Sequence, residues 1–443
     1  MIPITKPFLG EEEAALARQA ILSGWVTQGP KVKQFEEAFA AYVGSKYACA
    51  TSNCTTALHL ALLAVGVKPG DVVITVSHSF IATANCVRHC GGEPVFMDID
   101  LKTCNLSVKS LEQFLEEKCV CRQGQLFYKD VLKLAGGESP LKYFVDRKKD
   151  SSEALGRVAA ILTVHQLGMP CDLKNILALS RKFQVPVVED AAYAIGSEVS
   201  LDDGKSFGKV GKPHGDMACF SFHPRKVLVT GEGGMLTTNN EQLDAQVRLL
   251  RHQGMGTSDL VRHKSNKVIF ETYDVTGYNY RMSDIQASIG IEQLKKIPAM
   301  LERRRQIAQM YAIGLKDISW MEVFSEPSDA KYNWASYLVR ILDHAPKSRD
   351  ELMQYLLDQG VSTRPGVMNA HRETPYQNYA WHLPESEKAR DSIILLPSFH
   401  EIKDEEFDAL VSSWTENQTV EINQKAYDRY DVKKFAETEA EAE

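Results

Sequence analysis

Short apolar runs alternate with segments of helical spacing along the first half of the chain, and this alternation constrains the fold more than any other feature. The apolar runs cover residues 47–51, 72–76, 94–98, 159–164 and 185–190. Each has the length of a buried strand, and strands that alternate with helices form parallel sheets. The sequence therefore predicts an α/β fold with a doubly wound, mainly parallel sheet.

The chain of 443 residues is too long for one hydrophobic core, since cores stop growing beyond about 250–300 residues. We expect a large α/β domain over residues 1–250 and a smaller C-terminal α+β domain over 251–420. Residues 119–157 interrupt the strand–helix order without a clear strand, which predicts an inserted surface segment, helical around 128–135. The acidic residues 421–443 predict a flexible tail.

A long helical pattern follows Ser283 in the second domain. We expect this helix to break at Pro298, because proline lacks the N–H that a helix interior needs. A second helix is expected over residues 299–314.

Lys226 lies between two predicted strands, after the apolar run 217–222 and before the Gly-Glu-Gly-Gly turn at 231–234. Its neighbours would hold such a lysine, and burial disfavours the ammonium form, so its amine could act as a nucleophile. A single loop lysine is more often simply solvated. The functional interpretation therefore needs partners elsewhere in the chain.

Candidate partners lie at the carboxyl ends of other predicted strands. Asp190 ends one strand, Cys54 and Thr55 lie at a strand-to-helix junction, and Phe80 lies near the start of a further helical segment. Open α/β sheets bind ligands at this edge. The alternatives are a helix cap at Thr55 or Asn53 and an aspartate that only anchors a loop.

Together these residue types meet the requirements of pyridoxal 5'-phosphate. The cofactor needs an amine for a Schiff base, which Lys226 supplies, and a carboxylate that keeps its pyridine nitrogen protonated, which Asp190 supplies. It also needs a flat apolar side chain and phosphate donors, which a helix N-terminus provides. We expect no metal site, because the histidines show no ligand spacing.

Five ordered motifs resemble those of the DegT/DnrJ/EryC1/StrS family. They lie at Asn53–Leu62, Phe80–Asn85, Glu189–Ala192, Ser221–Gly234 and Gly277–Ser283, and Gly24–Pro30 resembles the family's opening loop. The resemblance covers roughly residues 3–110 and 158–415. It implies a fold type I (aspartate aminotransferase-like) enzyme that moves an amino group from an amino acid, L-glutamate, to a keto sugar on a nucleoside diphosphate.

The resemblance also implies roles for the cofactor-binding residues. Lys226 would attach the cofactor and shift the proton, Asp190 would face the pyridine nitrogen, and Phe80 would stack on the ring. The phosphate would be held by Cys54, Thr55 and Ser221.

Family members are homodimers with shared active sites, and Asn279 matches the asparagine that completes the phosphate site of the partner subunit. The substrates would contact Trp25, His165, Arg364 and His371. Tyr193 departs from the family pattern, which has glutamine or histidine there. A phenol can still donate to the phenolic oxygen of the cofactor. The pair Asn53-Cys54 and the segment 119–157 are further departures.

The composition limits the kinds of partner and the cellular compartment that we expect. A net charge of −7 argues against nucleic acid as the main partner, and no apolar run has the length of a membrane span. The N-terminal residues lack the pattern of a secretory signal, and nine cysteines without framework spacing predict free thiols in a reducing cytoplasm.

Three alternatives remain beside aminotransfer. A family branch of sugar dehydratases has histidine in place of the Schiff-base lysine, whereas this chain has Lys226. A regulatory protein on the same fold would be expected to lose Lys226 or Asp190. A nicotinamide dehydrogenase is disfavoured, because no G-x-G-x-x-G follows the first strand.

Overall fold

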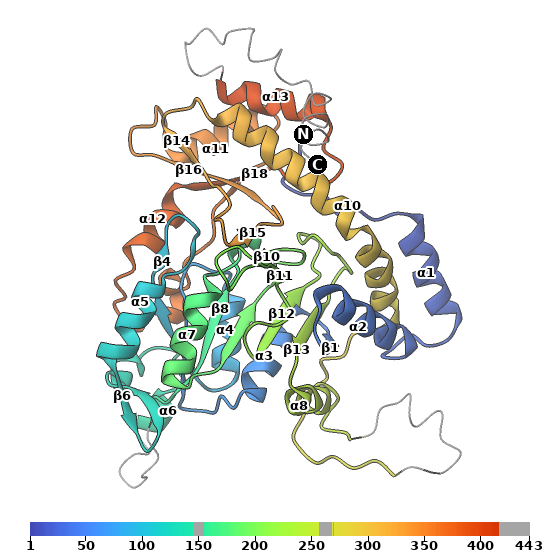
Figure 1. Ribbon diagram of the computed structural model, residues 1–443, viewed down its shortest axis with the longest axis vertical. Coiled ribbons are helices and arrows are strands. Elements are labelled where there is room, and N and C mark those ends of the chain that lie inside the picture. Colours follow the sequence, from blue (N-terminus) through green and yellow to red (C-terminus); the bar gives the residue numbers. More distant parts are fainter. Residues whose placement is uncertain (146–154, 257–267, 269, 416–443) are drawn as a thin grey trace.

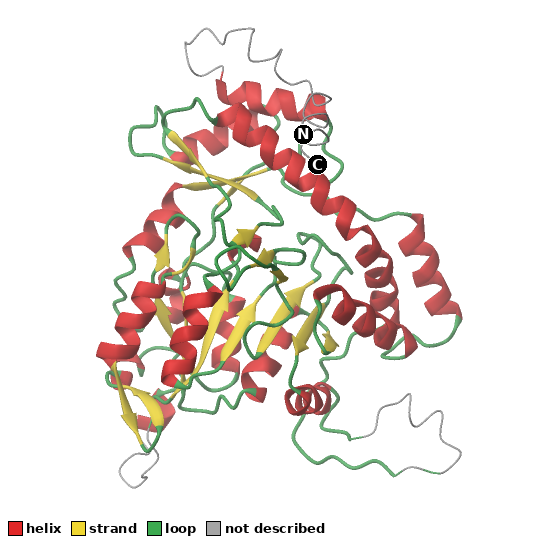
Figure 2. Cartoon of the chain, viewed as in Figure 1, coloured by secondary structure: helices red, strands yellow, loops and turns green. Residues whose placement is uncertain are grey.

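The computed structural model describes residues 1–145, 155–256, 268 and 270–415. Its centre is a seven-stranded sheet, seen as a fan of arrows in Figures 1 and 2. In spatial order the strands are β1 (Tyr47–Thr51), β13 (Gly234–Thr238), β12 (Met217–Ser221), β9 (Val187–Asp190), β8 (Val158–Val164), β2 (Val72–Val76) and β3 (Glu93–Met97). Only β13 runs against its neighbours, so the prediction of a mainly parallel α/β sheet is confirmed.

Helices cover both faces of this sheet, because its strands are apolar on both sides. Successive residues of β12 show the alternation: Cys219 packs in a cluster with Leu58 and Leu62, whereas Phe220 packs with Phe39 in another. The flanking helices are α2 (Pro30–Val43), α3 (Cys54–Ala64), α4 (Ala82–His89), α5 (Val108–Gln113), α7 (Leu173–Phe183) and α8 (Glu241–Arg251). Helix α1 (Glu11–Leu22) packs instead against the long helix at 284–315.

A second, antiparallel sheet is built from the C-terminal part of the chain. Its strands, in spatial order, are β14 (Met321–Val323), β16 (Tyr337–Ile341), β18 (Ile393–Leu396) and β17 (Arg364–Pro365). Its helices are α11 (Arg349–Asp358), α12 (Pro384–Ser392) and α13 (Asp404–Thr415). Smaller pairings join β4 (Ile99–Asp100) to β5 (Asn105–Leu106), and β10 (Glu198–Val199) to β11 (Gly208–Lys209) and β15 (Ala330–Lys331).

One long helix, α10 (Asp284–Leu315), connects the two sheets and passes through Pro298 without a break (Figure 1). The predicted break at Pro298 is therefore wrong. Proline removes one hydrogen bond, but Ile297 and Met300 on either side of it are buried, and this packing keeps the helix continuous. Because α10 belongs to both parts, the division at residue 250 remains a prediction.

The segment 119–157 contains a hairpin, so the prediction that it lacks strands is wrong. Strands β6 (Cys119–Arg122) and β7 (Gln125–Tyr128) pair across a two-residue turn whose residues both have positive φ. A 3₁₀ turn at Val131–Leu134 and the short α6 (Lys142–Val145) follow. Several of its apolar side chains enter the main core rather than the surface, namely Leu126, Tyr128, Val131 and Leu134.

Residues 146–154 of that segment lie outside the described residues, as does the predicted tail at 421–443. Within the described ranges, none of the helices has both the length and the apolar character that a membrane span requires.

Candidate active site

A cavity of about 780 Å³ opens at the carboxyl ends of the parallel strands. One wall of the cavity comes from the large sheet and the loops that follow β1, β2, β8, β9 and β12. The opposite wall comes from the second sheet, through residues 364–368 and the end of β18. The cavity therefore lies where the topology of an open α/β sheet places ligand sites.

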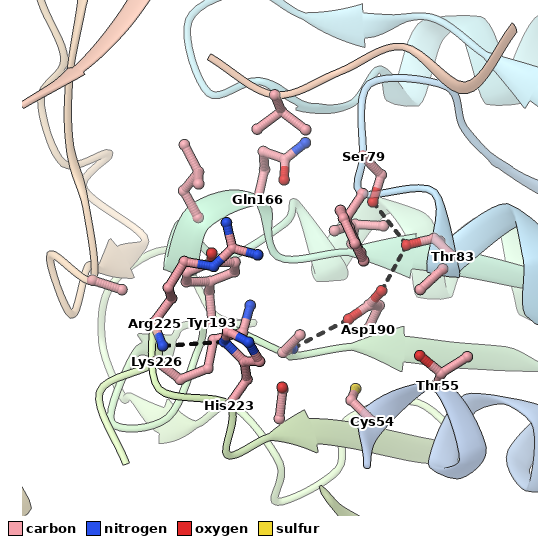
Figure 3. Close-up of a pocket in the computed structure, with 18 of the residues that line it drawn as sticks. Cys54, Thr55, Ser79, Thr83, Gln166, Asp190, Tyr193, His223, Arg225 and Lys226 are labelled. Atoms are coloured by element: carbon pink, nitrogen blue, oxygen red, sulfur yellow. Dashed lines mark hydrogen bonds between the residues drawn. The ribbon is translucent and has the colours of Figure 1, made fainter. Parts of the chain in front are cut away.

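Nine of the twelve residues that the sequence identified line this cavity. They are Cys54, Thr55, Phe80, His165, Asp190, Tyr193, Ser221, Lys226 and Arg364. Residues far apart in the sequence are thus brought to one place, and Figure 3 shows many of their side chains converging there.

The other three residues do not line the cavity. Asn279 is exposed and accepts a hydrogen bond from Arg281 Nε at 3.1 Å. Trp25 is half-buried on the loop before α2. His371 is buried beneath the loop after β2, with its Nδ1 at 2.6 Å from Ser77 Oγ.

The turn before β13 determines where Lys226 lies. Backbone hydrogen bonds from Phe222 N–H to Gly233 and from Thr230 N–H to Phe222 close the intervening loop at its base. A Cβ atom at Gly234 would lie 2.5 Å from the backbone of Asn53, so glycine is required for this close approach. The glycines therefore bring the lysine loop against the start of α3.

The N-terminus of α3 faces the cavity through Cys54 and Thr55. Asn53 is the cap, since its Oδ1 accepts the N–H of Thr56 at 2.9 Å, and Thr55 is not. The first N–H groups of a helix point out of its N-terminus and attract anions. A helix cap at Asn53 and an anion site at Cys54 and Thr55 are therefore compatible.

Asp190 is buried at the end of β9 and is held from two sides. Thr83 Oγ1 donates to Asp190 Oδ2 at 2.8 Å, and the N–H of Ala192 donates to Oδ1 at 3.2 Å. Burial raises the pKa of the Asp190 carboxyl group, although these donors and the charge of Lys226 act in the opposite direction.

Tyr193 lies directly beside the lysine, with the Lys226 ammonium 3.0 Å from the centre of its ring. Burial alone would raise the pKa of the phenol. The positive charges of Lys226, Arg225 and Arg364 outweigh that effect and lower the pKa. The phenol is therefore a better hydrogen-bond donor than an ordinary tyrosine.

His165 is fixed by two hydrogen bonds. The N–H of Cys171 donates to its Nδ1 at 3.1 Å, so that nitrogen carries no proton. Its Nε2–H therefore donates to Glu189 Oε2, 3.0 Å away. The ring is held in one tautomer and borders the cavity.

Polar residues of this cavity that the sequence reasoning missed include Ser79, Thr83, Gln166 and Arg225. Ser79 lies on the loop before α4 and Thr83 lies in the first turn of that helix, so two hydroxyl residues close to a predicted helix start were the available signal. Gln166 is held by a hydrogen bond from its Nε2 to the carbonyl of His78.

The donor set fits pyridoxal phosphate, since a primary amine, a buried carboxylate and a helix N-terminus border one cavity. Among the described residues, no group of three or more histidine, cysteine, aspartate or glutamate side chains could hold a metal ion. All nine cysteines are free thiols.

Comparison with known proteins agrees with this chemistry. The model of the DegT/DnrJ/EryC1/StrS aminotransferase family matches residues 7–124 and 140–415, omitting only 125–139 of the inserted hairpin region between them. The chain is 32% identical over 410 residues to an uncharacterised protein, MJ1066, of Methanocaldococcus jannaschii, covering 91% of this chain and 94% of that one.

A second relative is the spore coat polysaccharide biosynthesis protein SpsC of Bacillus subtilis, 32% identical over 418 residues, covering 93% of this chain and 96% of that one. Among solved structures, the aminotransferase TlmJ of Streptoalloteichus hindustanus superposes with a TM-score of 0.76 at 29% identity, covering 94% and 98% of the two chains. The chain belongs to the DegT/DnrJ/EryC1/StrS aminotransferase family, whose members are pyridoxal phosphate-dependent enzymes.

Proposed function

We propose that the protein transfers the amino group of an amino acid, L-glutamate, to a keto sugar carried on a nucleoside diphosphate. The observation that carries the proposal is the meeting of Lys226, Asp190 and the N-terminus of α3 in one cavity. A sugar acceptor is supported by the name of the relative SpsC, which refers to polysaccharide biosynthesis.

Bound pyridoxal phosphate would supply an aldehyde that accepts the amino group and a ring that withdraws electrons from the reacting carbon. Lys226 would provide the amine that attaches it and would then move the proton. Asp190 would hold a proton at the ring nitrogen, and Phe80 would cover the ring. The amide and hydroxyl groups of Cys54, Thr55 and Ser221 bind the phosphate.

The remaining space suits two anionic substrates in turn. A cavity of about 780 Å³ is at the upper end of the usual ligand-site range of about 300–1,000 Å³. Arg225 and Arg364 add positive charge beside Lys226, which favours the carboxylates of the donor and the diphosphate of the acceptor. His165 and Tyr193 border the same space.

The protein would act as a homodimer. Asn279 is exposed and lies outside the cavity of its own chain. This position suits an asparagine that reaches the phosphate site of the partner subunit. The buried His371 supports the loop after β2 in place of a direct substrate contact.

The test is reductive trapping followed by an acceptor assay. Borohydride treatment of the purified protein with pyridoxal phosphate should label the peptide that contains Lys226, as read by mass spectrometry. Lys226→Ala should still bind the cofactor and should not turn over. A panel of nucleotide-linked 3-keto and 4-keto sugars with glutamate should release 2-oxoglutarate for at least one sugar.

Two results would overturn the proposal. Label on another residue, or no binding of pyridoxal phosphate, would exclude the assigned site. A labelled Lys226 with no amino transfer to any keto sugar would retain the cofactor chemistry and exclude the sugar acceptor.

A further inference from the structure

Two hydroxyl groups form a hydrogen-bonded chain behind Asp190. Thr83 Oγ1 lies 2.8 Å from Asp190 Oδ2, and Ser79 Oγ lies 2.8 Å from Thr83 Oγ1 (Figure 3). None of the three side chains is more than 5% exposed, and all three border the cavity. These three hydrogen-bonded side chains are therefore shielded from bulk water and lie beside the cavity.

The direction of the protons follows from the chemistry of the groups. An ionised carboxylate only accepts, so Thr83 must donate its single proton to Asp190. Ser79 must then donate to Thr83. The N–H of Ala192 occupies the other carboxylate oxygen at 3.2 Å. Both oxygens of Asp190 are thus held, and the plane of the carboxylate is fixed.

The loop that carries Ser79, at the far end of this hydrogen-bonded series, is anchored to the C-terminal part of the protein. The N–H of Ser79 donates to the carbonyl of Ser77 at 2.9 Å. Ser77 Oγ in turn contacts His371, at 2.6 Å from Nδ1 and 3.0 Å from its backbone N–H. His78 Nδ1 pairs with Asn369 Oδ1 at 3.0 Å. The loop that carries Ser79 therefore has a fixed position.

We propose that Thr83, oriented by Ser79, is a positioning residue that fixes the Asp190 carboxylate and keeps it ionised toward the ring nitrogen of the cofactor. This inference rests on the proposed function. A hydrogen bond to the charged form of a carboxylate stabilises that form, and a bond to an ion is about twice as strong as a neutral one. Without Thr83, the carboxylate keeps only one donor and can rotate about its side-chain bond.

The experiment compares two substitutions at Thr83. Thr83→Val removes the hydroxyl at nearly constant volume, and Thr83→Ser retains it. Thr75→Val is the matched control: the hydroxyl of Thr75 is also buried and donates to the carbonyl of Leu162 at 2.8 Å, but Thr75 does not border the cavity.

Thr83→Val should raise the dissociation constant of pyridoxal phosphate about tenfold or more, as measured by titration of the apoprotein. It should also lower kcat more than it changes KM. The ¹⁵N chemical shift of the labelled ring nitrogen should move toward the unprotonated value. Thr83→Ser should restore the dissociation constant and kcat to within about threefold of the wild type and return the ¹⁵N shift to its wild-type position. Thr75→Val should leave all three quantities unchanged.

Different outcomes separate the two proposals. Wild-type affinity and an unchanged ¹⁵N shift in Thr83→Val would overturn the inference and leave the proposed function intact. A wild-type protein that binds no pyridoxal phosphate would overturn both. If Thr83→Val does not fold, Ser79→Ala decides the question: it should weaken binding in the same direction, and unchanged binding would overturn the inference.

Discussion

The ammonium of Lys226 lies over the face of Tyr193, 3.0 Å from the ring centre. A cation above an aromatic ring is attracted by the negative face of the ring. Tyr193 therefore offers two separate properties to the site, a ring that holds the lysine and a phenol that can donate a hydrogen bond. Glutamine or histidine, which the family pattern has at the position of Tyr193, offers the donor with a different planar group.

Substitutions at Tyr193 should separate these two properties. Tyr193→Phe keeps the ring and removes the phenol, and we expect a loss of about tenfold in the rate of the first half reaction, as for one hydrogen bond to a charged group. Tyr193→Gln should retain most of that rate. Stopped-flow absorbance with glutamate measures both. A normal rate in Tyr193→Phe with a slow Tyr193→Gln would show that the ring is the essential part.

Asp190→Asn should slow the proton transfer by about 100-fold or more, because a neutral amide does not keep the ring nitrogen protonated. Single-turnover kinetics with glutamate will measure the rate. Asp216→Asn is the control: Asp216 also accepts a backbone N–H, from Val187 at 2.8 Å, but it does not border the cavity. An equal loss in both variants would assign the effect to the sheet rather than to the cofactor.

Two leucines of one 3₁₀ turn test whether the inserted segment belongs to the core. Leu134 is fully buried, whereas Leu132 is 59% exposed. Leu134→Ala should lower the free energy of unfolding by about 2–5 kcal/mol, and Leu132→Ala should change it by less than about 0.5 kcal/mol. Urea unfolding measures both. Similar small losses would mean that the segment is only a surface addition.

Pro298→Ala should stabilise the protein. The exposed proline lacks the N–H that would bond to the carbonyl of Leu294 within α10, and alanine restores it. We expect a gain of about 1–3 kcal/mol in the free energy of unfolding, read from the denaturation midpoint. A loss of stability would indicate that the helix needs a bend at this position.

His78 should make the protein less stable in mild acid. Burial lowers the pKa of His78 to about 4, against about 6.5 in the unfolded chain, despite the opposing hydrogen bond from His78 Nδ1 to Asn369 Oδ1. As the pH falls from 6.5 to 4, the unfolded chain binds a proton that the folded chain does not. The free energy of unfolding should therefore decrease by about 2 kcal/mol between pH 7.5 and pH 5 on account of His78.

The check on this prediction is the difference between wild type and His78→Gln at the two pH values, since glutamine does not titrate. Urea unfolding curves give the free energies. An equally steep decrease in the variant would assign the acid sensitivity to other groups, such as His59, whose pKa burial also lowers to about 4.

The large sheet was predictable because its strands are short apolar runs separated by helices. The convergence of Lys226, Asp190 and Thr55 was predictable for the same reason, since parallel strands end at one edge. The partners of Asp190 were not, because Ser79 and Thr83 have the pattern of ordinary helix-start residues. Only the fold shows that the Thr83 hydroxyl, itself bonded to Ser79, donates to a carboxylate 107 residues away in the sequence.

Two local predictions were wrong because packing outweighed local preference. Pro298 favours a break, but the buried residues around it keep α10 continuous through that position. The hairpin at 119–128 was hidden because its turn is Gln123-Gly124, with φ of 51° and 76°, rather than a common Asn-Gly pair. We expected His371 to contact the substrate, whereas it lies outside the cavity and its ring contacts Ser77.

The position of β18 has a consequence for the order in which the enzyme matures. This strand lies between β16 and β17, and its residues Leu395 and Leu396 close one wall of the cavity. A ribosome makes the chain from the N-terminus, so Lys226 and Asp190 are synthesised long before that wall exists. The complete cavity therefore requires the chain as far as Leu396, 170 residues beyond Lys226.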